Sequence, residues 1–484
     1  MKSRDYELTF HTADIDPKVL RIHRMRATER LGQLFEVDLE VVMLAGERLD
    51  PDEIIGATSH VEIHLGEELV RTLHGLVTHV VELPPLETET AVYRLTLHPL
   101  LWQASMVETF DIHLSCSVPE VVEAKMALLH LGVGTDYSLQ LSETYPQREL
   151  IVQYGESDLA LLSRLCEHLG IFFYFAHEKE QSLLVFGDDT SAYRPIDDDD
   201  TVAYRARGER EGVLALTLDR SLIPGIYVCR DYNYRTPTLE LQLQHDVQEG
   251  FGGAVIEYGG HFNTPDGGQH LAKVRAQEAL SRLQVFSGES DDPRFAPGHT
   301  FQLEGHPRHN GAYLITGIEH DAAQPVAGFG AGDEHGYTNR FTAIPADRTY
   351  RPARRTPIPR IDGVVTGVIE TSQGELERFA KLDDHGRYMV RFLFDTAAPG
   401  ERQASCPVRL MQPSAGTGYG THFPLKPGVE VAVGFIGGNP DRPLILGAVP
   451  NPITPTPVYD AGSTKSRIKT RSGIVIEFDD ADRG

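Results

Sequence analysis

The sequence has few cysteines and no long hydrophobic run. Its four cysteines are far apart and form no Cys-x-x-Cys pair, so we predict buried free thiols at Cys116, Cys166, Cys229 and Cys406. No run of about 18 apolar residues could span a bilayer, and the start, MKSRDYELTF, lacks the apolar core of a signal peptide. We therefore expect a chain that folds in the cytoplasm, carries no signal peptide and has no stable membrane insertion.

Positive charge is also scarce. The 484 residues include 45 lysines and arginines against 70 aspartates and glutamates, which gives a net charge of -25. A surface with this excess of carboxylates repels phosphate groups, so it argues against nucleic acid and anionic membranes as partners. The length is sufficient for roughly two to four domains.

The usual catalytic and nucleotide-binding motifs are missing. Gly155-Glu156-Ser157-Asp158 fails as a Gly-x-Ser-x-Gly elbow at its last position, and we interpret it as a helix start. There is no Gly-x-x-x-x-Gly-Lys loop, and the glycine-rich stretch 328–332 lacks the strand-to-helix setting of a dinucleotide site. The sequence therefore predicts no catalytic residues and no cofactor site. A carboxylate pair for glycoside hydrolysis stays open, because the separation of the two groups is a three-dimensional quantity.

Histidines are the best metal-ligand candidates, and we interpret them as surface and turn residues. They are His299, His306, His309, His320 and His335. Pro307 lies within the closest pair, so that pair is not on a helix face, and there is no His-Glu-x-x-His motif or nearby cysteine. The acidic run Asp197–Asp200 is interpreted as a solvated loop, because it lacks the alternating ligand spacing of a calcium site, which is the alternative. The sequence therefore predicts no metal site.

Apolar and polar residues alternate through residues 5–100, which predicts antiparallel strands with one solvent-exposed face, as in a barrel. The alternating residues are Tyr6, Leu8 and Phe10, then Phe35, Val37, Leu39 and Val41, then Val61, Ile63 and Leu65, then Ala91, Tyr93, Leu95 and Leu97. Alternation returns at 212–262, and further strands are predicted at 299–305, 312–319 and 337–344.

Three helices interrupt this pattern. A Ser-x-x-Glu capping box opens the helix predicted over 117–131. A second helix is predicted from Ser157 to Gly170, with a stripe of leucines on one face. Alanines and leucines at helical spacing predict a third helix over 268–284.

Residues 346–360 combine five arginines with several prolines, which stiffen a chain toward an extended form. We interpret this segment as a solvated, semi-rigid connector. The alternative is that its arginines pair with acidic loops of a neighbouring chain. The arginines are Arg348, Arg351, Arg354, Arg355 and Arg360.

Residues 361–451 hold about five predicted strands between glycine turns, which is typical of an OB-type barrel. Val429–Phe435 has one apolar side with period 2, and the apolar run Leu444–Val449 is typical of a strand buried on both faces. The other predicted strands are Gly363–Thr371, Glu377–Asp383 and Tyr388–Phe394.

Several short motifs occur in the order found in one protein family. They are Tyr419–Leu425, Asn439–Pro443 and Gly447–Val449, together with Asp231–Arg235 and Tyr337–Phe341. On these motifs the sequence, from about residue 5 to its C-terminus, resembles the VgrG family. VgrG proteins are the spikes of type VI secretion systems and are related to the hub and needle proteins of contractile phage tails.

The resemblance implies a mostly β fold with inserted helices. Residues 1–345 would form a phage-hub-like domain of two barrel subdomains, and 361–451 an OB-fold collar. After a linker at 452–465, alternating apolar residues in 466–484 would start a triple-stranded β-helix needle. That needle stops as soon as it starts, so we expect either a truncated form or an unusually short family member. No enzyme domain fits between collar and needle.

The resemblance also implies a structural, non-enzymatic function in which a homotrimeric hub joins a hexameric tube to a puncturing needle. Implied partners are an Hcp-type tube protein, a PAAR-type tip protein, baseplate proteins and the effector proteins that the spike delivers. Such a protein would assemble in the bacterial cytoplasm and then be secreted into a target cell. Two alternatives remain open: the hub-spike of a phage tail or extracellular contractile injection particle, and, from another class, a cell-wall hydrolase.

Overall fold

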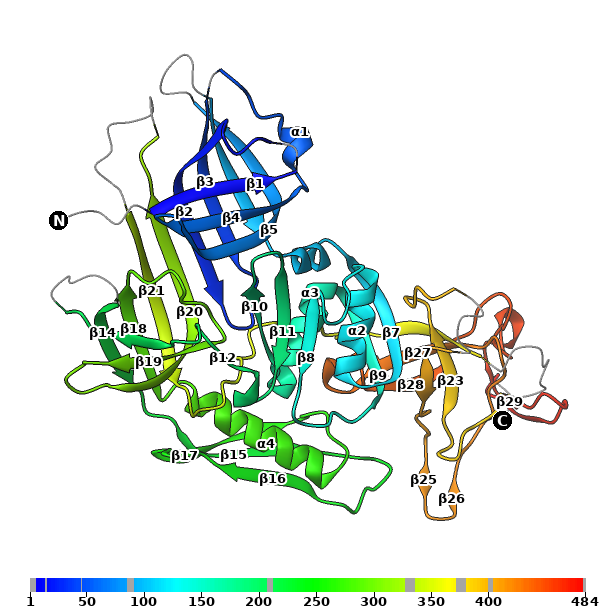
Figure 1. The fold of residues 1–484 in the computed structure, drawn as a ribbon. Helices are drawn as coiled ribbons and strands as arrows, with labels where there is room; N and C mark the ends of the chain where they lie inside the picture. The colour runs from blue at the N-terminus through cyan, green and yellow to red at the C-terminus, as the bar shows by residue number, and fades with distance from the viewer. Residues whose placement is uncertain are drawn as a thin grey trace. The chain divides into compact units, whose positions relative to one another are not determined.

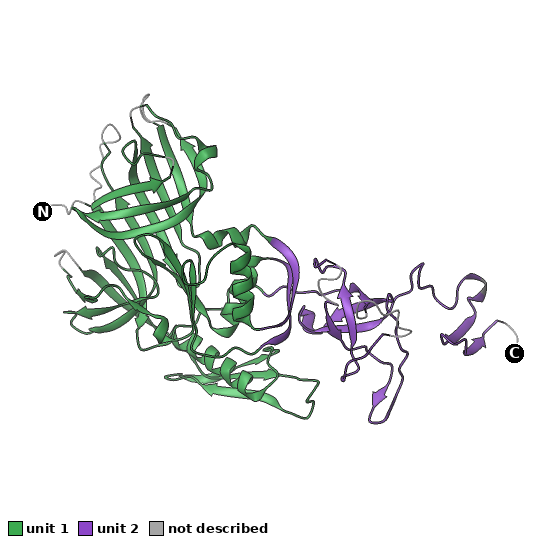
Figure 2. Cartoon of the chain, turned by 45° about the vertical axis from the view of Figure 1, so that its right-hand side comes forward, with its two compact units in different colours: residues 1–107, 117–146, 157–357 green, residues 108–116, 147–156, 358–484 purple. Residues whose placement is uncertain are grey.

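The computed structural model describes residues 6–13, 15–44, 46–84, 91–206, 212–326, 336–370, 380–398 and 404–481. The chain forms two compact units, shown in Figure 2: unit 1 has residues 1–107, 117–146 and 157–357, and unit 2 has residues 108–116, 147–156 and 358–484. The chain therefore enters unit 2 three times, at residues 108, 147 and 358. No helix in the described ranges is long and apolar enough to cross a bilayer.

The first barrel of unit 1 is built from the strands that the early alternation predicts. Its strands are β1 (Tyr6–Thr12), β2 (Leu20–Arg30), β3 (Glu36–Met43), β4 (Thr58–Leu65), β5 (Glu68–Leu83) and β6 (Ala91–His98). They are hydrogen-bonded in the order β1-β4-β5-β6-β3-β2, and every neighbouring pair is antiparallel. Leu8, Val37 and Leu95 point inward and are buried, so the predicted alternation is confirmed.

The same sheet continues into a second barrel. Its strands are β12 (Arg194–Pro195), β13 (Thr201–Ala203), β14 (Val213–Arg220), β18 (Gln284–Ser290), β19 (His299–Glu304), β20 (Gly311–Ala323) and β21 (Gly336–Pro345). The order runs from β2 through β20, β21 and β18 to β14, and β19 pairs with β20, β12 and β13. The two predicted barrel subdomains are therefore two ends of one 13-stranded sheet, in which β20 belongs to both (Figure 1).

The joint between the two barrels is the antiparallel pairing of β2 with β20, which extends over seven residue pairs. On one face of this joint, arginines of β2 pair with acids of β20. Arg24 lies 2.9 Å from Asp321, and Arg30 lies 2.8 Å from Glu319. On the other face, β2 presents the carboxylate of Glu29, which is 3% exposed.

Glu29 is the centre of a buried hydrogen-bond network at this joint. Its carboxylate contacts the guanidinium of Arg71 on β5 and lies 2.9 Å from Nε2 of His320 on β20. His177 Nε2 lies 3.6 Å from the other carboxylate oxygen, and the hydroxyl of Tyr337 lies 2.6 Å from His320 Nδ1. A buried charge is tolerated only when it is paired and hydrogen-bonded, so these groups must come together as the strands assemble.

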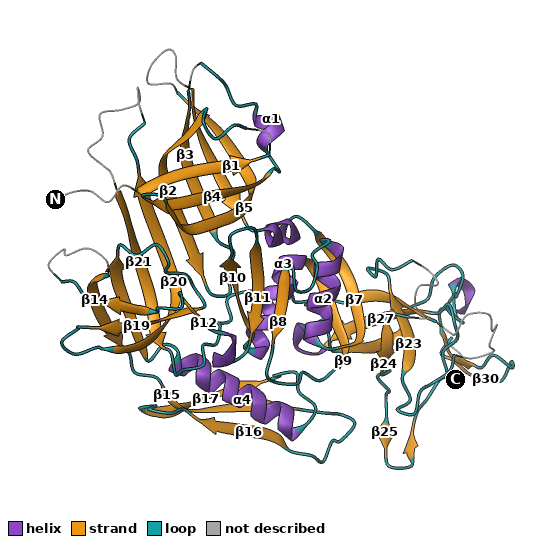
Figure 3. Ribbon diagram, in the orientation of Figure 1, coloured by secondary structure: helices purple, strands orange, loops and turns teal. Residues whose placement is uncertain are grey.

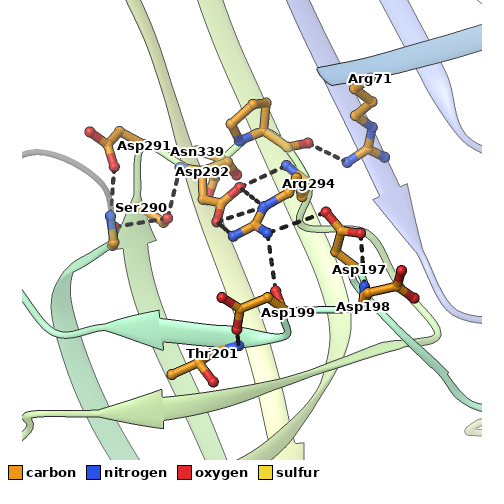
Figure 4. Close-up of polar contacts among 12 residues, drawn as sticks. Arg71, Asp197, Asp198, Asp199, Thr201, Ser290, Asp291, Asp292, Arg294 and Asn339 are labelled. Carbon is orange, nitrogen blue, oxygen red and sulfur yellow. Dashed lines mark hydrogen bonds and ion pairs between the residues drawn. The ribbon is translucent and has the colours of Figure 1, made fainter. Parts of the chain in front are cut away.

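Arg71 also reaches across to the second barrel. Its guanidinium donates to the carbonyl of Pro293 at 3.0 Å (Figure 4). It also donates to the carbonyl of Phe295, and both residues lie in the loop after β18. Asn339 of β21 donates to the carbonyl of Asp292 in the same loop at 2.8 Å. One arginine of the first barrel therefore helps to hold a loop of the second.

Burial and pairing shift the titration of this network. Burial alone would raise the pKa of Glu29, but Arg71 and the two histidines hold that pKa well below its ordinary value. Burial lowers the pKa values of His177 and His320. Near neutral pH the folded protein therefore keeps an ionised Glu29 beside two neutral histidines.

The helices are α1 (Pro51–Ile54), α2 (Val118–Leu128), α3 (Asp158–Leu169) and α4 (Pro265–Leu280). The capping box at the start of α2 is confirmed, because the side chains of Ser117 and Glu120 each accept from the other's backbone N–H. Ser157 caps α3, and Gly170 ends it in the left-handed conformation at φ 74°. α4 begins earlier than predicted, since Thr264 caps it.

Two small sheets complete unit 1. Their strands are β8 (Tyr137–Gln140), β10 (Phe172–His177), β11 (Ser182–Gly187), β15 (Pro224–Asp231), β16 (Leu241–Asp246) and β17 (Gly252–Tyr258). The first sheet has the order β10-β11-β8, and the second has the order β16-β15-β17 with α4 on one face (Figure 3). Ala276, Ala279 and Leu283 pack against Tyr227 and Val247 between the helix and this second sheet.

The expectation of a solvated connector at 346–360 is wrong for Arg351 and Pro352, which are buried, whereas Arg354, Arg355 and Arg360 are exposed, as expected. Arg351 is only 3% exposed, and its guanidinium donates to the carbonyl of Gly170 and to the side chain of Gln277, each at 2.9 Å. These contacts fasten the segment to the end of α3 and to α4. A charge can be buried here because carbonyl and amide oxygens accept its hydrogen bonds.

Other arginines of the segment pair with acids of the same chain. Arg348 lies 3.0 Å from Glu249, and Arg354 contacts Glu257 on β17. The sequence analysis left open that these arginines pair with acidic loops of a neighbouring chain. Arg348 and Arg354 do not need such a partner, because each already has an acidic partner in its own chain.

Unit 2 is centred on a five-stranded sheet with the order β24-β23-β22-β27-β28. Its strands are β22 (Val365–Ile369), β23 (Tyr388–Phe392), β24 (Cys406–Val408), β27 (Glu430–Phe435) and β28 (Pro443–Ala448). Val431 and Val433 are fully buried, as the period of 2 predicts. The prediction that Leu444–Val449 is buried on both faces is wrong for the single chain, because Ile445 is buried whereas Leu446 is 39% exposed.

One predicted strand of the barrel lies partly outside the described residues. Glu377–Asp383 begins within 371–379, which the structure does not describe, and Leu382 makes an isolated bridge to Tyr388. The glycine-rich stretch 328–332 also lies outside the described residues.

Two strands from early in the sequence belong to unit 2. β7 (Glu108–Cys116) pairs with β9 (Arg148–Ser157), and Ile112 and Val152 of these strands join the hydrophobic core of the barrel. The Val152 N–H donates to Asp441 at 2.7 Å, and Arg387 lies 2.9 Å from Glu149. Part of the region expected to form the hub therefore completes the collar barrel.

The last described residues form a hairpin of β29 (Lys465–Lys469) and β30 (Val475–Asp479). A smaller hairpin, β25 (Ala415–Gly416) with β26 (Tyr419–Gly420), lies earlier in unit 2. The three-chain β-helix expected for 466–484 stays a prediction, because it requires other chains.

We predict that Ile112→Ala destabilises the collar barrel by about 2–5 kcal/mol, because Ile112 lies in its core and the smaller side chain leaves a cavity. Hydrogen exchange should accelerate in β22 and β23. Leu393→Ala is the control, since Leu393 is 63% exposed, and it should change stability by less than about 0.5 kcal/mol. Unchanged exchange in β22 and β23 of the Ile112 variant would contradict the shared core.

We also predict that unit 1 loses stability as the pH falls below about 6.5, where histidines of an unfolded chain take up protons. His177 and His320 resist protonation in the fold, so the unfolded state binds more protons and is favoured. The lowered pKa of Glu29 acts in the same direction, since its contribution is present above the unfolded carboxyl pKa and is lost as the pH falls through the folded value.

The measurement is the urea midpoint of unit 1 between about pH 5 and pH 8. His320→Gln should flatten the pH slope by up to about 1.4 kcal/mol per pH unit, the maximum for one proton. His385→Gln, in an exposed turn of the collar, is the control and should keep the wild-type slope. If the stability of unit 1 changes with pH equally in the wild type and in His320→Gln, His320 is not a source of the pH dependence.

Candidate functional site

The C-terminal hairpin has two chemically different faces. Directly opposed residues share a face, and the register places Ile468 opposite Ile476 and Arg467 opposite Glu477. One face is therefore apolar and includes Ile474 and Phe478, whereas the other holds charges. The apolar side chains are exposed, at 45% for Ile468 and 66% for Phe478. A lone two-stranded hairpin is marginally stable, so this face calls for a partner.

The charged face is held by ion pairs within the hairpin. Lys465 Nζ lies 2.8 Å from Glu477, and Arg467 contacts the same carboxylate. Hydrogen bonds from these two cations lower the pKa of Glu477. The charges on this face already have partners within the hairpin. The apolar face, in contrast, is exposed and can bind another chain.

Further apolar side chains are exposed in the collar and on one sheet of unit 1. In the collar, Tyr419 is 71% and Phe423 is 52% exposed. In unit 1, the sheet that carries α4 on one face exposes Phe251, Ile256 and Tyr258 at 79%, 64% and 74%. Exposed apolar residues that recur along strands are typical of interaction surfaces.

A group of histidines around Glu62 lies on the first barrel. Among the described residues, His11, His60 and Glu62 are the only three histidine, cysteine or acidic residues whose ligand atoms all lie within 4.8 Å of one another. His64 Nε2 lies 2.8 Å from Glu62. The sequence analysis missed this group, although the alternation His-x-Glu-x-His on β4 could have indicated it, because alternate residues of a strand share a face.

The histidines that the sequence did single out lie in different places. His306 and His309 are neighbours, with ring centroids 5.0 Å apart, and His306 Nδ1 accepts the backbone N–H of His309 at 3.0 Å. His320 belongs to the Glu29 network, and burial lowers the pKa of His299 to about 4. His335 lies outside the described residues.

The acidic loop Asp197–Asp200 receives a positive charge from its own chain. The guanidinium of Arg294 lies 3.6 Å from Asp197, donates to the Asp199 carbonyl at 3.2 Å and pairs with Asp292 at 2.7 Å (Figure 4). Its hydrogen bond with Asp292 raises the pKa of Arg294. This arrangement favours the interpretation as an ordinary loop over a calcium site.

The cysteines are free thiols. Cys166, Cys229 and Cys406 are buried, as predicted, whereas Cys116 is partly exposed. Burial raises the pKa of Cys166 to about 12 and that of Cys229 to about 11, so at neutral pH these two carry little of the reactive thiolate.

Two family models match the sequence. The model of the phage tail baseplate hub (GPD) matches residues 28–326, which is more than half of the chain. The model of the type VI secretion system/phage-baseplate injector OB domain matches residues 379–449, which include four of the five strands of the unit 2 sheet: β23, β24, β27 and β28.

Curated relatives include type VI secretion spike proteins. The chain is 29% identical over 482 residues to spike protein VgrG1c of Pseudomonas aeruginosa, which covers 97% of this chain and 65% of that protein. It is 31% identical to VgrG5 of the same species, covering 91% of this chain and 57% of VgrG5. It is 27% identical to the actin cross-linking toxin VgrG1 of Vibrio cholerae, of which it covers 39%. The chain therefore spans less than two thirds of the length of these relatives.

Solved structures share the fold. An E. coli component of the type VI secretion system, with structural similarity to the phage T4 tail proteins gp27 and gp5, has a TM-score of 0.68 at 24% identity and covers 92% of this chain and 100% of that one. A chain of the lidded Francisella PdpA-VgrG complex has a TM-score of 0.63 at 8% identity, covering 99% and 76%. This chain therefore belongs to the phage tail baseplate hub (GPD) family and is a relative of the VgrG spike proteins of type VI secretion systems.

Proposed function

We propose that the chain is the hub-and-collar part of a type VI secretion spike, a structural component that works as a homotrimer. The matches to the hub and injector OB families, in this order along the chain, support the assignment. The VgrG relatives align with nearly the whole chain, which supports the same assignment. The proposed function involves no catalysed reaction.

The observation that carries the trimer is the two-faced C-terminal hairpin. Its apolar face is exposed in one chain, and burying one isoleucine or phenylalanine side chain contributes about 1.5–3 kcal/mol. Three hairpins around a common axis would bury this face and pair their free edges, whereas the charged face would stay in water. We therefore propose that this hairpin is the start of a triple-stranded needle.

The remaining partners follow from the relatives and belong to the proposal. The hub would bind an Hcp-type hexameric tube and baseplate proteins, and the complete spike would carry a PAAR-type tip protein and effectors. The Francisella PdpA-VgrG complex is one case of a second protein bound to a VgrG. The trimer would assemble in the bacterial cytoplasm and then be secreted into a target cell.

The hub-spike of a phage tail or an extracellular contractile particle is the second candidate, since the hub family is described from phage baseplates. Neighbouring genes distinguish the two: a sheath-recycling ATPase and membrane-complex genes indicate type VI secretion. A cell-wall hydrolase is the third candidate. Release of soluble fragments from purified peptidoglycan, abolished by one carboxylate substitution, would overturn the structural assignment.

We predict that the wild-type chain has three times its monomer mass in solution, and that Ile476→Asp shifts the equilibrium toward monomers by at least about tenfold in dissociation constant. The reason is that Ile476 lies on the apolar face of the hairpin. Mass photometry or light scattering measures the result.

The matched control is Val475→Asp, because Val475 is the next residue, is 47% exposed and lies on the charged face. It should leave the trimer intact. A wild-type chain that stays monomeric at micromolar concentration, or equal effects of the two substitutions, would refute the hairpin as the site of trimer contact.

A further inference from the structure

Three neighbouring strands of the first barrel place imidazoles in a row. The register pairs His11 of β1 with His60 of β4, and His60 with His74 of β5. His60, Glu62 and His64 alternate along β4 and therefore point to the same side of the sheet. The result is a carboxylate surrounded by imidazoles, which is the set of donors that zinc prefers in the absence of thiolates.

The distances match those of a metal site before ligand adjustment. His11 Nε2 lies 3.2 Å from one oxygen of Glu62, and His60 Nε2 lies 3.7 Å from the other. Two ligands of a tetrahedral zinc ion, each about 2.0–2.1 Å from the metal, lie about 3.3–3.4 Å apart. The rings of His11 and His60 are stacked, with centroids 4.7 Å apart and planes 6° apart, so one imidazole must rotate before both rings can direct a nitrogen lone pair at the same ion. His11 Nε2 would also have to give up its 3.0 Å contact with the Thr9 hydroxyl.

The surroundings also fit a coordination site. His64 Nε2 lies 2.8 Å from a Glu62 oxygen, where it can orient the carboxylate as groups around metal ligands commonly do. The side chains of His11, Glu62 and His60 are 31%, 22% and 32% exposed, so water can fill a fourth position. A cleft of about 310 Å³ is lined by His60 and His74, so one of the three proposed ligands borders open space.

We propose that His11, His60 and Glu62 bind one zinc ion, which fastens strand β1 to β4. β1 is the end strand of the sheet order and pairs with β4 alone among the described strands, so a metal bridge between their side chains would restrain it. This inference is independent of the proposed secretion function. It places the site away from the histidines of 299–335 that the sequence singled out.

The same residues also allow a different interpretation, in which protonated histidines simply neutralise Glu62. The test must therefore detect the metal itself. The full chain, purified without a histidine tag and stripped with a chelator, is titrated with Zn²⁺ by calorimetry, and bound metal is counted by mass spectrometry after dialysis. We expect one tightly bound zinc ion per chain and, with Co²⁺ in place of zinc, the visible absorption of a tetrahedral site.

Glu62→Gln and His11→Gln should each weaken zinc binding at least tenfold, with the fold of both variants checked by circular dichroism. His306→Gln is the matched control, because His306 and His309 form a separate histidine pair, and it should bind zinc as the wild type does. Zinc should also slow hydrogen exchange of the β1 peptide in the wild type but not in Glu62→Gln. The absence of zinc binding, or binding that Glu62→Gln leaves unchanged, would overturn the proposal.

Discussion

The pairing of β2 with β20, with the buried carboxylate of Glu29 beside it, is the constraint on which the hub depends. The two barrels are not separate domains on a flexible link, because one sheet runs through both. Glu29 can stay ionised in the interior only while Arg71 and His320 remain in place, and these come from β5 and β20. Because Glu29 and Arg71 both belong to the first barrel, separation at β20 would take His320 away from the buried carboxylate and would break the bonds of Arg71 to the loop after β18. The continuous sheet and the bonds around Glu29 therefore join the two barrels into one body.

The collar barrel is stabilised differently, by strands from two earlier parts of the chain. Its core includes Ile112 and Val152, which come from two excursions of the chain between segments of unit 1. The Val152 N–H and the Glu149 carboxylate are bonded to the barrel residues Asp441 and Arg387. Because the chain enters unit 2 three times, hub and collar are joined through several covalent connections rather than a single linker.

The sequence predicted local features well and long-range contacts poorly. Alternation predicted the strands, and Ser117 and Ser157 predicted the starts of two helices, because these signals depend on neighbouring residues. The burial of Arg351 was not predicted, since arginine is usually solvated and its acceptors, the carbonyl of Gly170 and the side chain of Gln277, lie far away in the sequence. The histidine group around Glu62 was missed because His11 and His74 come from other strands. They reach the group only because β1 and β5 pair with β4, and the sequence does not show that pairing.

The central claim is that the hub unfolds as a single body. Hydrogen exchange at increasing urea, read separately for peptides of β3 and β6 in the first barrel and of β18 and β21 in the second, tests it most directly. The account predicts that both barrels lose protection at the same urea concentration. Loss of protection in one barrel while the other stays protected would contradict it.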